Sequence, residues 1–177
     1  ANTPCNPHIG GSAKGIVVRE IDALGGMMGK FADHYPLQIK MLNTGKGPGV
    51  QCLRAQVDKH AYPAYVQSVL EKTNNLTIKE CQVVSLLHDD KKVFGVVLEN
   101  GEKITSKATI ITTGTYMEST LISGKEVVPG GPDGEKPSCG LSKCLQKMGF
   151  DIIRFKTGTP PRIKKSSIDF SCGSIQP

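Results

Sequence analysis

The residues best suited to chemistry gather near the start of the 177-residue sequence, in the stretch NTPCNPHIGGSAKG at positions 2–15. Cys5 stands between two prolines, and a histidine, a glycine pair and Lys14 follow it. A cysteine attacks other groups only as its thiolate, which a positively charged environment favours. A glycine-rich loop that leads into a helix can also present backbone N–H groups to an anion. A lone cysteine is nevertheless more often a small buried apolar residue, so both interpretations of Cys5 stay open at this point.

A second segment rich in glycine and cations, NTGKGPGVQCLRAQVDK, covers positions 43–59. We expect a loop here, in which Lys46, Gly47 and Arg54 could hold phosphate or flavin oxygens, because backbone amides and cations together form anion sites. A solvated basic loop explains these residues equally well. Asp58 is placed to cap the helix that follows.

Composition excludes several classes of protein. Hydrophobic residues make up 38% of the chain, which suits one domain with a core and not a disordered tail. No apolar run approaches the roughly 18 residues of a membrane-spanning helix. The net charge of +6 is compatible with a nucleic-acid partner, but an ordinary basic surface is as good an explanation. Tryptophan is absent and aromatic residues are few, so recognition by base stacking is not indicated.

The six cysteines do not form a recognisable framework. Only Cys139 and Cys144 lie close together, and their spacing is not that of a zinc site. We therefore expect reduced thiols in a reducing compartment and assign no metal site.

Apolar periodicity predicts helices over residues 13–24, 27–33, 58–72 and 141–148. It predicts short strands at 37–42, 76–80, 83–88, 93–99, 103–105, 108–112 and 152–155. Ser12 is expected to cap the first helix, and Pro63 to kink or delay the third. Asn100-Gly101 is a strong hairpin signal.

The apolar run ATIIT at 108–112 has the character of a buried parallel strand, ending in a turn at Thr113, Gly114 and Thr115. We expect a mobile loop at 118–137, where glycine, proline and charge leave little to bury, and an irregular connector toward a next domain at 150–177. The whole pattern predicts an α/β domain with an antiparallel β-meander inserted at 76–107. Two-dinucleotide-binding, Rossmann-like FAD domains have this arrangement, but their GxGxxG phosphate fingerprint is missing here.

Four blocks of the sequence resemble one family. They are CNPHIGGSAKGIVVREIDALGGMMGK, LNTGKGPGVQCLRAQVDKHAY, TIITTGTYM, and GFDIIRFKTGTPPRI with SIDFS after it. In order and spacing they resemble the tRNA uridine 5-carboxymethylaminomethyl modification enzymes (MnmG, also called GidA). The likeness runs from about position 3 to position 171. Because members of this family begin with a strand and a Gly-rich dinucleotide loop, the resemblance implies that this chain is an internal fragment of a larger flavoenzyme.

The resemblance implies a function for the full enzyme. Members hold FAD, use NADH to reduce it, and act as homodimers with a GTPase partner of the MnmE type on tRNA. Together they add an aminomethyl-type group at carbon 5 of the wobble uridine, in the cytoplasm or, in eukaryotes, the mitochondrion. The NADH site would lie outside this chain. Without the phosphate loop, we expect the 177 residues alone to bind FAD very weakly or not at all.

The resemblance also implies roles for individual residues. Cys5 matches the family's CNP motif and becomes the candidate catalytic thiolate, which would add to carbon 6 of uracil. Ser138 matches a flavin-contact position, although a cap for the helix at 141 explains it as well. Cofactor contacts are implied at Asn6, Gly10, Gly11, Lys14, Lys46, Gly47, Arg54, Val83, Thr113, Gly114, Thr115 and Ser138.

Two positions depart from the family pattern. Gln51 stands where an arginine is usual, and Pro132 stands where the GGRxG pattern has its arginine. Each change removes a cation from a loop expected near the cofactor.

Two alternatives remain for the function. The first is the related folate-dependent flavoprotein tRNA (uracil-5) methyltransferase, which would lack the long CNPxIGGxxKG block. The second is a non-catalytic module for RNA binding or dimerisation, which the basic charge allows but the scarcity of aromatic residues disfavours.

Overall fold

A computed structural model describes residues 2–4, 6–161 and 163–175 of the chain. The helices are α1 (Lys14–Ala23), α2 (Met28–His34), α3 (Ala61–Glu71) and α4 (Leu141–Lys147). The strands are β1 (His8–Gly10), β2 (Pro36–Leu42), β3 (Cys52–Val57), β4 (Val83–His88), β5 (Val93–Leu98), β6 (Lys103–Thr105), β7 (Thr120–Ser123) and β8 (Glu126–Pro129). Short 3-10 turns lie at Pro48–Val50, Pro132–Gly134, Lys165–Ser167 and Phe170–Cys172.

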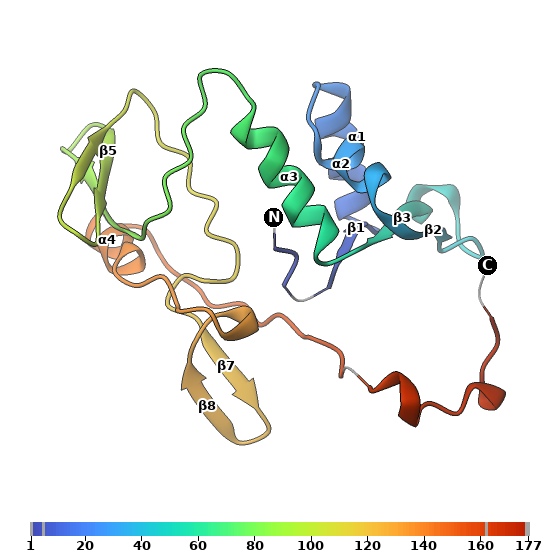
Figure 1. Ribbon diagram of the computed structural model, residues 1–177. Coiled ribbons are helices and arrows are strands. Elements are labelled where there is room, and N and C mark those ends of the chain that lie inside the picture. The colour runs from blue at the N-terminus through green and yellow to red at the C-terminus, as the bar shows by residue number, and fades with distance from the viewer. Residues whose placement is uncertain (1, 5, 162, 176–177) are drawn as a thin grey trace.

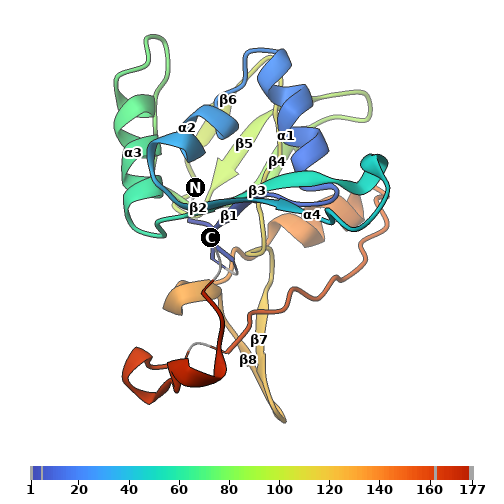
Figure 2. The same ribbon diagram turned by 90° about the vertical axis from the view of Figure 1, so that its right-hand side faces the viewer.

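The N-terminal part forms a layer of three helices on a three-stranded antiparallel sheet of order β1-β3-β2. Ile9, Ala55 and Ile39 lie opposite one another across the three strands. Figure 2 shows α1, α2 and α3 on one side of this sheet. The core between them is apolar and well buried; it consists of Ile9, Phe31, Ala32, Val57, Tyr62 and Val66.

Strand β3 corrects the expectation of a loop throughout 43–59. The loop ends at Gln51, and Cys52–Val57 is the central strand of the sheet, paired on both sides. Burial of Cys52 and Val57 at the two ends of the strand holds it in place, which local composition did not reveal. Asp58 accepts hydrogen bonds from the backbone N–H of His60 and of Ala61, each at 2.8 Å, so it pairs with donors at the start of α3, although the cap position itself is His60.

The predicted meander is confirmed as an antiparallel sheet of order β4-β5-β6. At its second turn the Asn100 side chain accepts a hydrogen bond from the Glu102 N–H at 3.0 Å, and Gly101 has a φ of +83°. The strand predicted at 76–80 does not form; this stretch is exposed and pairs with no described strand.

Residues 108–112 form no strand, contrary to expectation, and Ile110 is 86% exposed. A buried parallel strand needs hydrogen-bonding neighbours on both edges. Every strand pair in the described part of the chain is antiparallel, and none involves 108–112. The strand predicted at 152–155 is irregular for the same lack of a partner.

The segment expected to be a mobile loop contains a β-hairpin instead. Strands β7 and β8 pair around Gly124 and Lys125, with Ser123 opposite Glu126. Gly124 has a φ of +60°, which suits a two-residue hairpin loop. Figure 1 shows the hairpin projecting away from the rest of the molecule, and all of its strand residues are exposed.

The four predicted helices are confirmed, but neither Ser12 nor Ser138 caps a helix. Helix α1 begins after Ala13 and α4 after Gly140, and neither end has a side-chain cap. Pro63 lies in the first turn of α3, where a proline is tolerated, so the helix starts late and does not kink.

Candidate functional site

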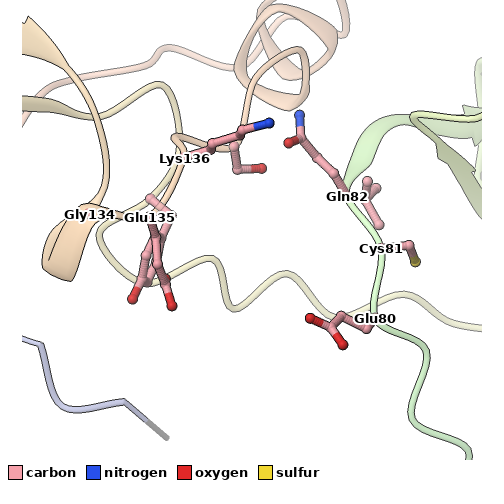
Figure 3. Close-up of a pocket in the computed structure, with 9 residues that line it drawn as sticks. Glu80, Cys81, Gln82, Gly134, Glu135 and Lys136 are labelled. Atoms are coloured by element: carbon pink, nitrogen blue, oxygen red, sulfur yellow. The ribbon is translucent and has the colours of Figure 1, made fainter.

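A groove of about 640 Å³ lies between the start of β4 and the segment that follows the hairpin. Figure 3 shows residues from these two walls facing one another. The groove is lined by Glu80, Cys81, Gln82, Val83, Tyr116, Gly134, Glu135, Lys136 and Ser138. Val83 and Ser138, two of the expected cofactor contacts, are therefore brought together from positions far apart in the sequence.

Backbone pairing fixes Ser138 in the groove wall. Its N–H donates to the Tyr116 carbonyl at 2.8 Å, and its own carbonyl accepts from the Glu118 N–H at 2.7 Å. Met117 and Ser138 thus form an isolated parallel bridge. The alternative that Ser138 caps α4 is wrong, because Gly140 occupies the capping position with a φ of +100°.

The predicted turn at 113–115 leads into this wall. Gly114 has a φ of +59° and lies next to the Tyr116 ring, so the chain reverses closely there. The Thr115 hydroxyl oxygen is buried and has no hydrogen-bond partner among the described residues. The buried Tyr116 hydroxyl lies near Asn2 and Glu135 without a hydrogen bond of ordinary geometry in the described part. An unpaired buried hydroxyl is costly, so Thr115 points to an additional polar partner.

Charges of both signs surround the groove. The Lys136 ammonium and the Gln82 amide extend toward each other from opposite walls (Figure 3). The Glu80 and Glu135 side chains also line the groove and lie below them in this view. Burial raises the pKa of Tyr116, with a smaller contribution from Glu135, so this phenol stays protonated near neutral pH. A ligand here would meet one cation, two carboxylates and several hydrogen-bonding groups.

Sequence reasoning missed a pair of side chains that braces the wall from behind. Glu118 accepts a hydrogen bond from the Gly140 N–H at 3.2 Å. Arg154 donates to the Met117 carbonyl at 2.7 Å and lies 3.9 Å from the Glu118 carboxylate. Glu118 has a φ of +44°, a conformation that costs a residue with a Cβ about 1–3 kcal/mol. Only tertiary pairing imposes this conformation, so no local signal could have shown it.

A second group of expected contacts lies at the junction of β1, β3 and α1. The N–H of Gly11 donates to the Leu53 carbonyl at 3.0 Å, and Gly10 lies opposite Arg54. A Cβ at Gly10 would come within 2.2 Å of the Leu53 oxygen, so close strand packing alone requires glycine there. Lys14 donates from Nζ to the His8 carbonyl at 3.0 Å.

Burial and the cations Lys14 and Arg54 lower the pKa of His8. Burial lowers the pKa of Lys14 as well. The contributions of Lys14 and Arg54 to the His8 shift show that cations lie close together at this junction, where an anion would be favoured.

The loop at 43–51 is attached to the same junction. The Asn43 amide donates to the Ser12 hydroxyl at 3.1 Å and to the Val50 carbonyl at 2.9 Å. Gln51, the replacement for a family arginine, donates from its side chain to the Lys46 carbonyl at 3.1 Å and so closes the loop. Lys46 and Gly47 thus belong to a loop that is held by hydrogen bonds and lies next to Gly10 and Gly11.

Two contacts join the two groups of residues. Asn2 donates to Glu135 at 3.3 Å, and Lys59 pairs with Asp133 at 2.7 Å. Asn6 accepts a backbone hydrogen bond from His8 at 2.8 Å. Cys5, the candidate nucleophile, lies outside the described residues, as does Arg162.

The five described cysteines form no disulfide with one another. No group of three or more metal-ligating side chains is found in the described ranges. Among the described helices, none combines the length and the apolar character needed to cross a membrane.

Comparison with known proteins gives a consistent result. A family model described as "Glucose inhibited division protein A" matches residues 1–177. A protein of Onion yellows phytoplasma (strain OY-M), named tRNA uridine 5-carboxymethylaminomethyl modification enzyme MnmG, is 53% identical over 99% of this chain and 28% of its own length. A protein of the same name from Bacillus thuringiensis (strain Al Hakam) is 49% identical over 98% of this chain and 28% of its own length.

Solved structures agree with these matches. Aquifex aeolicus GidA, in its form II crystal, superposes with a TM-score of 0.86 at 50% identity, over 95% of this chain and 28% of that one. The GidA-related protein from Thermus thermophilus has a TM-score of 0.52 at 18% identity over 67% of this chain and 52% of that one, which shows a shared fold alone. The chain spans between a quarter and a third of the length of the curated relatives that it matches.

Proposed function

Since this chain belongs to the glucose inhibited division protein A family, we propose that it forms part of an enzyme that modifies carbon 5 of the wobble uridine in tRNA. The proposed substrate is tRNA, the proposed product carries a carboxymethylaminomethyl-type group, and the proposed cofactors are FAD and NADH. A GTPase of the MnmE type and a second copy of the enzyme are the proposed partners. The proposed location is the cytoplasm, or the mitochondrion in a eukaryote.

One observation carries the cofactor assignment: Val83 and Ser138 line the same groove. We propose that this groove holds part of FAD, with the backbone at Val83 against the adenine and with 113–115 and Ser138 on the facing wall. Its volume of about 640 Å³ lies inside the range of roughly 300–1,000 Å³ that is usual for ligand pockets. The buried Thr115 hydroxyl, which has no hydrogen-bond partner in the described part of the chain, is a group that a nucleotide could satisfy.

The residues of this chain would bind and orient the cofactor and the substrate, while FAD supplies the redox chemistry when it is bound. The groove lining combines Lys136 with the Gln82 amide and the Ser138 and Tyr116 hydroxyls, which are groups that can orient a heterocycle by hydrogen bonding. The cations Lys14, Lys46 and Arg54 at the second group of residues are proposed to hold anionic groups of the cofactor or the substrate. Cys5 is proposed to add as a thiolate to carbon 6 of uracil, which makes carbon 5 nucleophilic.

The cofactor assignment can be tested in the full-length protein with Thr115→Val and Ser138→Ala. Each change removes one hydroxyl with little change in shape, and the loss of one hydrogen bond should raise the FAD dissociation constant by about tenfold. The exposed Ser174→Ala is the control and should leave FAD binding unchanged. Flavin fluorescence measures the FAD dissociation constant of each variant. If this constant is unchanged in both Thr115→Val and Ser138→Ala, the cofactor binds elsewhere.

The role of Cys5 needs its own experiment. Cys5→Ser in the full-length protein should abolish tRNA modification and leave FAD content unchanged, because a serine hydroxyl is scarcely ionised near neutral pH. Cys139→Ser, at an exposed position, is the control. Mass analysis of the wobble nucleoside measures the outcome; retained activity in Cys5→Ser would mean that the nucleophile is another residue.

A further inference from the structure

A second hollow, of about 280 Å³, lies between strand β4 and helix α4. It is lined by Val84, Ser85, His88, Gly140, Lys143, Cys144 and Lys147. Two of these residues are lysines, one is a histidine, and none is acidic. This composition differs from that of the larger groove, whose lining includes Glu80 and Glu135.

The frame of the hollow is tightly held. Cys144 of α4 lies against β4, with its Sγ 3.3 Å from the Ser85 hydroxyl and 3.4 Å from the Leu86 nitrogen. At the start of the helix, a Cβ on Gly140 would come within 2.8 Å of the Val84 oxygen, so backbone packs directly on backbone. Helix and strand therefore keep a fixed separation, and the hollow is not the product of a loose side chain.

The two lysines are arranged to act on one ligand. Lys143 and Lys147 are four residues apart on α4, so their side chains leave the same face of the helix. Within the described part of the chain, neither forms an ion pair. Lys143 is near enough to Glu118 to help lower the pKa of that carboxyl, but the Gly140 N–H is the larger cause. Two exposed ammonium groups and His88 thus converge on a hollow without a carboxylate in its lining.

The position of the hollow indicates which anion it would take. The two hollows share no lining residue: Val83 lines the larger groove, whereas Val84 and Ser85 line this hollow. Ser138 and Gly140 divide between the two hollows in the same way. Lys143 and Lys147 are therefore not among the groups that a cofactor in the groove would contact, and they are available to a different ligand.

From this arrangement we infer that the hollow between β4 and α4 binds the phosphate backbone of the RNA substrate, with Lys143 and Lys147 as the phosphate contacts. The inference rests on the proposed function for the identity of the RNA. Lysine ammonium groups bind phosphate as point charges, without reading the base sequence. The contact would hold the tRNA beside the groove and would not determine which tRNA is accepted.

The test uses the full-length, FAD-loaded enzyme and an unmodified tRNA transcript. The double variant Lys143→Gln with Lys147→Gln removes both charges and keeps the side-chain length. Binding of the transcript is measured by fluorescence anisotropy over a series of KCl concentrations. The double variant should bind about tenfold more weakly, and the slope of log K against log salt should become shallower by about 1–2. Lys143→Arg with Lys147→Arg should restore both values, because arginine keeps the charge.

The matched control is Lys103→Gln with Lys107→Gln, which changes the net charge equally at and just after β6, away from α4. It should leave affinity and salt slope close to those of the unaltered enzyme. A β4–α4 double variant that behaves like this control would overturn the inference and leave the proposed function intact. Loss of FAD together with tRNA binding would assign the lysines to the cofactor's surroundings and also overturn it. An unaltered enzyme that does not bind the transcript would overturn the proposed function and this inference together.

Discussion

The N-terminal layer (residues 6–72) and the groove region (residues 76–161) of this chain are stabilised in different ways. In the N-terminal layer, one cluster of buried side chains from two strands and two helices forms a continuous core. In the groove region, burial is scattered over single residues such as Leu86, Leu98 and Leu141. There, backbone pairing and the brace of Glu118 and Arg154 hold the walls in place.

The difference shows how this chain separates stability from binding. A packed core resists change, whereas a site that admits a ligand must leave some groups unsatisfied until the ligand arrives. Glu118 and Asp133, with φ of +44° and +57°, lie beside the groove, and the buried Thr115 hydroxyl lacks a partner in the described residues. Five experiments test whether the two regions differ in this way.

The largest effect is expected in the core of the N-terminal layer. Phe31→Ala should lower the free energy of unfolding by about 3–5 kcal/mol, because it leaves a cavity among buried neighbours. Leu24→Ala, at a position that is 90% exposed, should change it by less than about 0.5 kcal/mol. Urea unfolding followed by circular dichroism measures both. Equal effects would show that the cluster is not a core.

A glycine at the same layer should give the next largest effect. Gly10→Ala forces a Cβ to within 2.2 Å of the Leu53 oxygen at a φ of +103°, so β1 must move away from β3. We expect a loss of about 2–3 kcal/mol, from the backbone strain and the broken pairing together. Gly11→Ala is the matched control, since its φ is similar but its Cβ would meet nothing within 4 Å. If the two variants lose equal stability, the positive φ alone explains the need for glycine at both positions, and the contact with the Leu53 oxygen does not matter.

The brace behind the groove should have a smaller effect. Arg154→Ala removes the hydrogen bond to the Met117 carbonyl and should cost about 1 kcal/mol. Amide exchange at residues 116–118 should speed up, while exchange in β3 should not change. Arg154→Lys should recover part of the protection. If amide exchange became faster to the same extent at residues 116–118 and in β3, Arg154 would not act as a local brace.

Acid should weaken the same brace through Glu118. The Gly140 N–H, first among several causes, holds the pKa of this carboxyl below its ordinary value of 4.5. The stabilisation is therefore complete above the unfolded pKa and is lost as the pH falls through the lower, folded pKa. Glu118→Gln should flatten this part of the stability–pH curve measured by urea unfolding. A curve that keeps its slope in the variant would assign the acid dependence to other carboxyls.

The smallest effect is expected at an apolar residue. Ile110→Ser should change the stability of the 177-residue chain by less than about 0.5 kcal/mol, because the side chain is 86% exposed. A loss comparable to that of Phe31→Ala would mean that 108–112 is buried in solution. Thermal unfolding of the two variants side by side gives the comparison.

Local patterns predicted the elements whose stabilising signals are themselves local. The four helices, the meander and the Asn100-Gly101 turn were all predicted from periodicity and turn residues. Strand β3 was missed because its position depends on β1 and β2, which lie far from it in sequence. The run 108–112 was predicted as a strand from its apolar character, but apolar character supplies no hydrogen-bonding neighbour.

The candidate site shows the same limit. The family resemblance gave Val83 and Ser138, and the structure brings them to one groove. It did not give Tyr116, Glu118 or Arg154, whose positions follow from the pairing of Met117 with Ser138. That pairing joins segments separated by the whole β7–β8 hairpin, so no window of neighbouring residues contains it. The roles assigned to Cys5 and to the cofactor contacts stay predictions.

The projecting hairpin has a consequence for how the protein behaves at high concentration. Leu121, Ile122, Val127 and Val128 are all exposed, so both faces of a two-stranded ribbon are apolar, and its outer edges pair with no other described strand. Such a ribbon is a template on which identical chains can add strand by strand into insoluble aggregates. Pro129 removes one backbone donor at an end, and the Lys125–Glu126 tip carries the only charges of the two strands and their turn. These three residues are gatekeepers against self-assembly, and neutralising the tip would favour precipitation over any loss of fold.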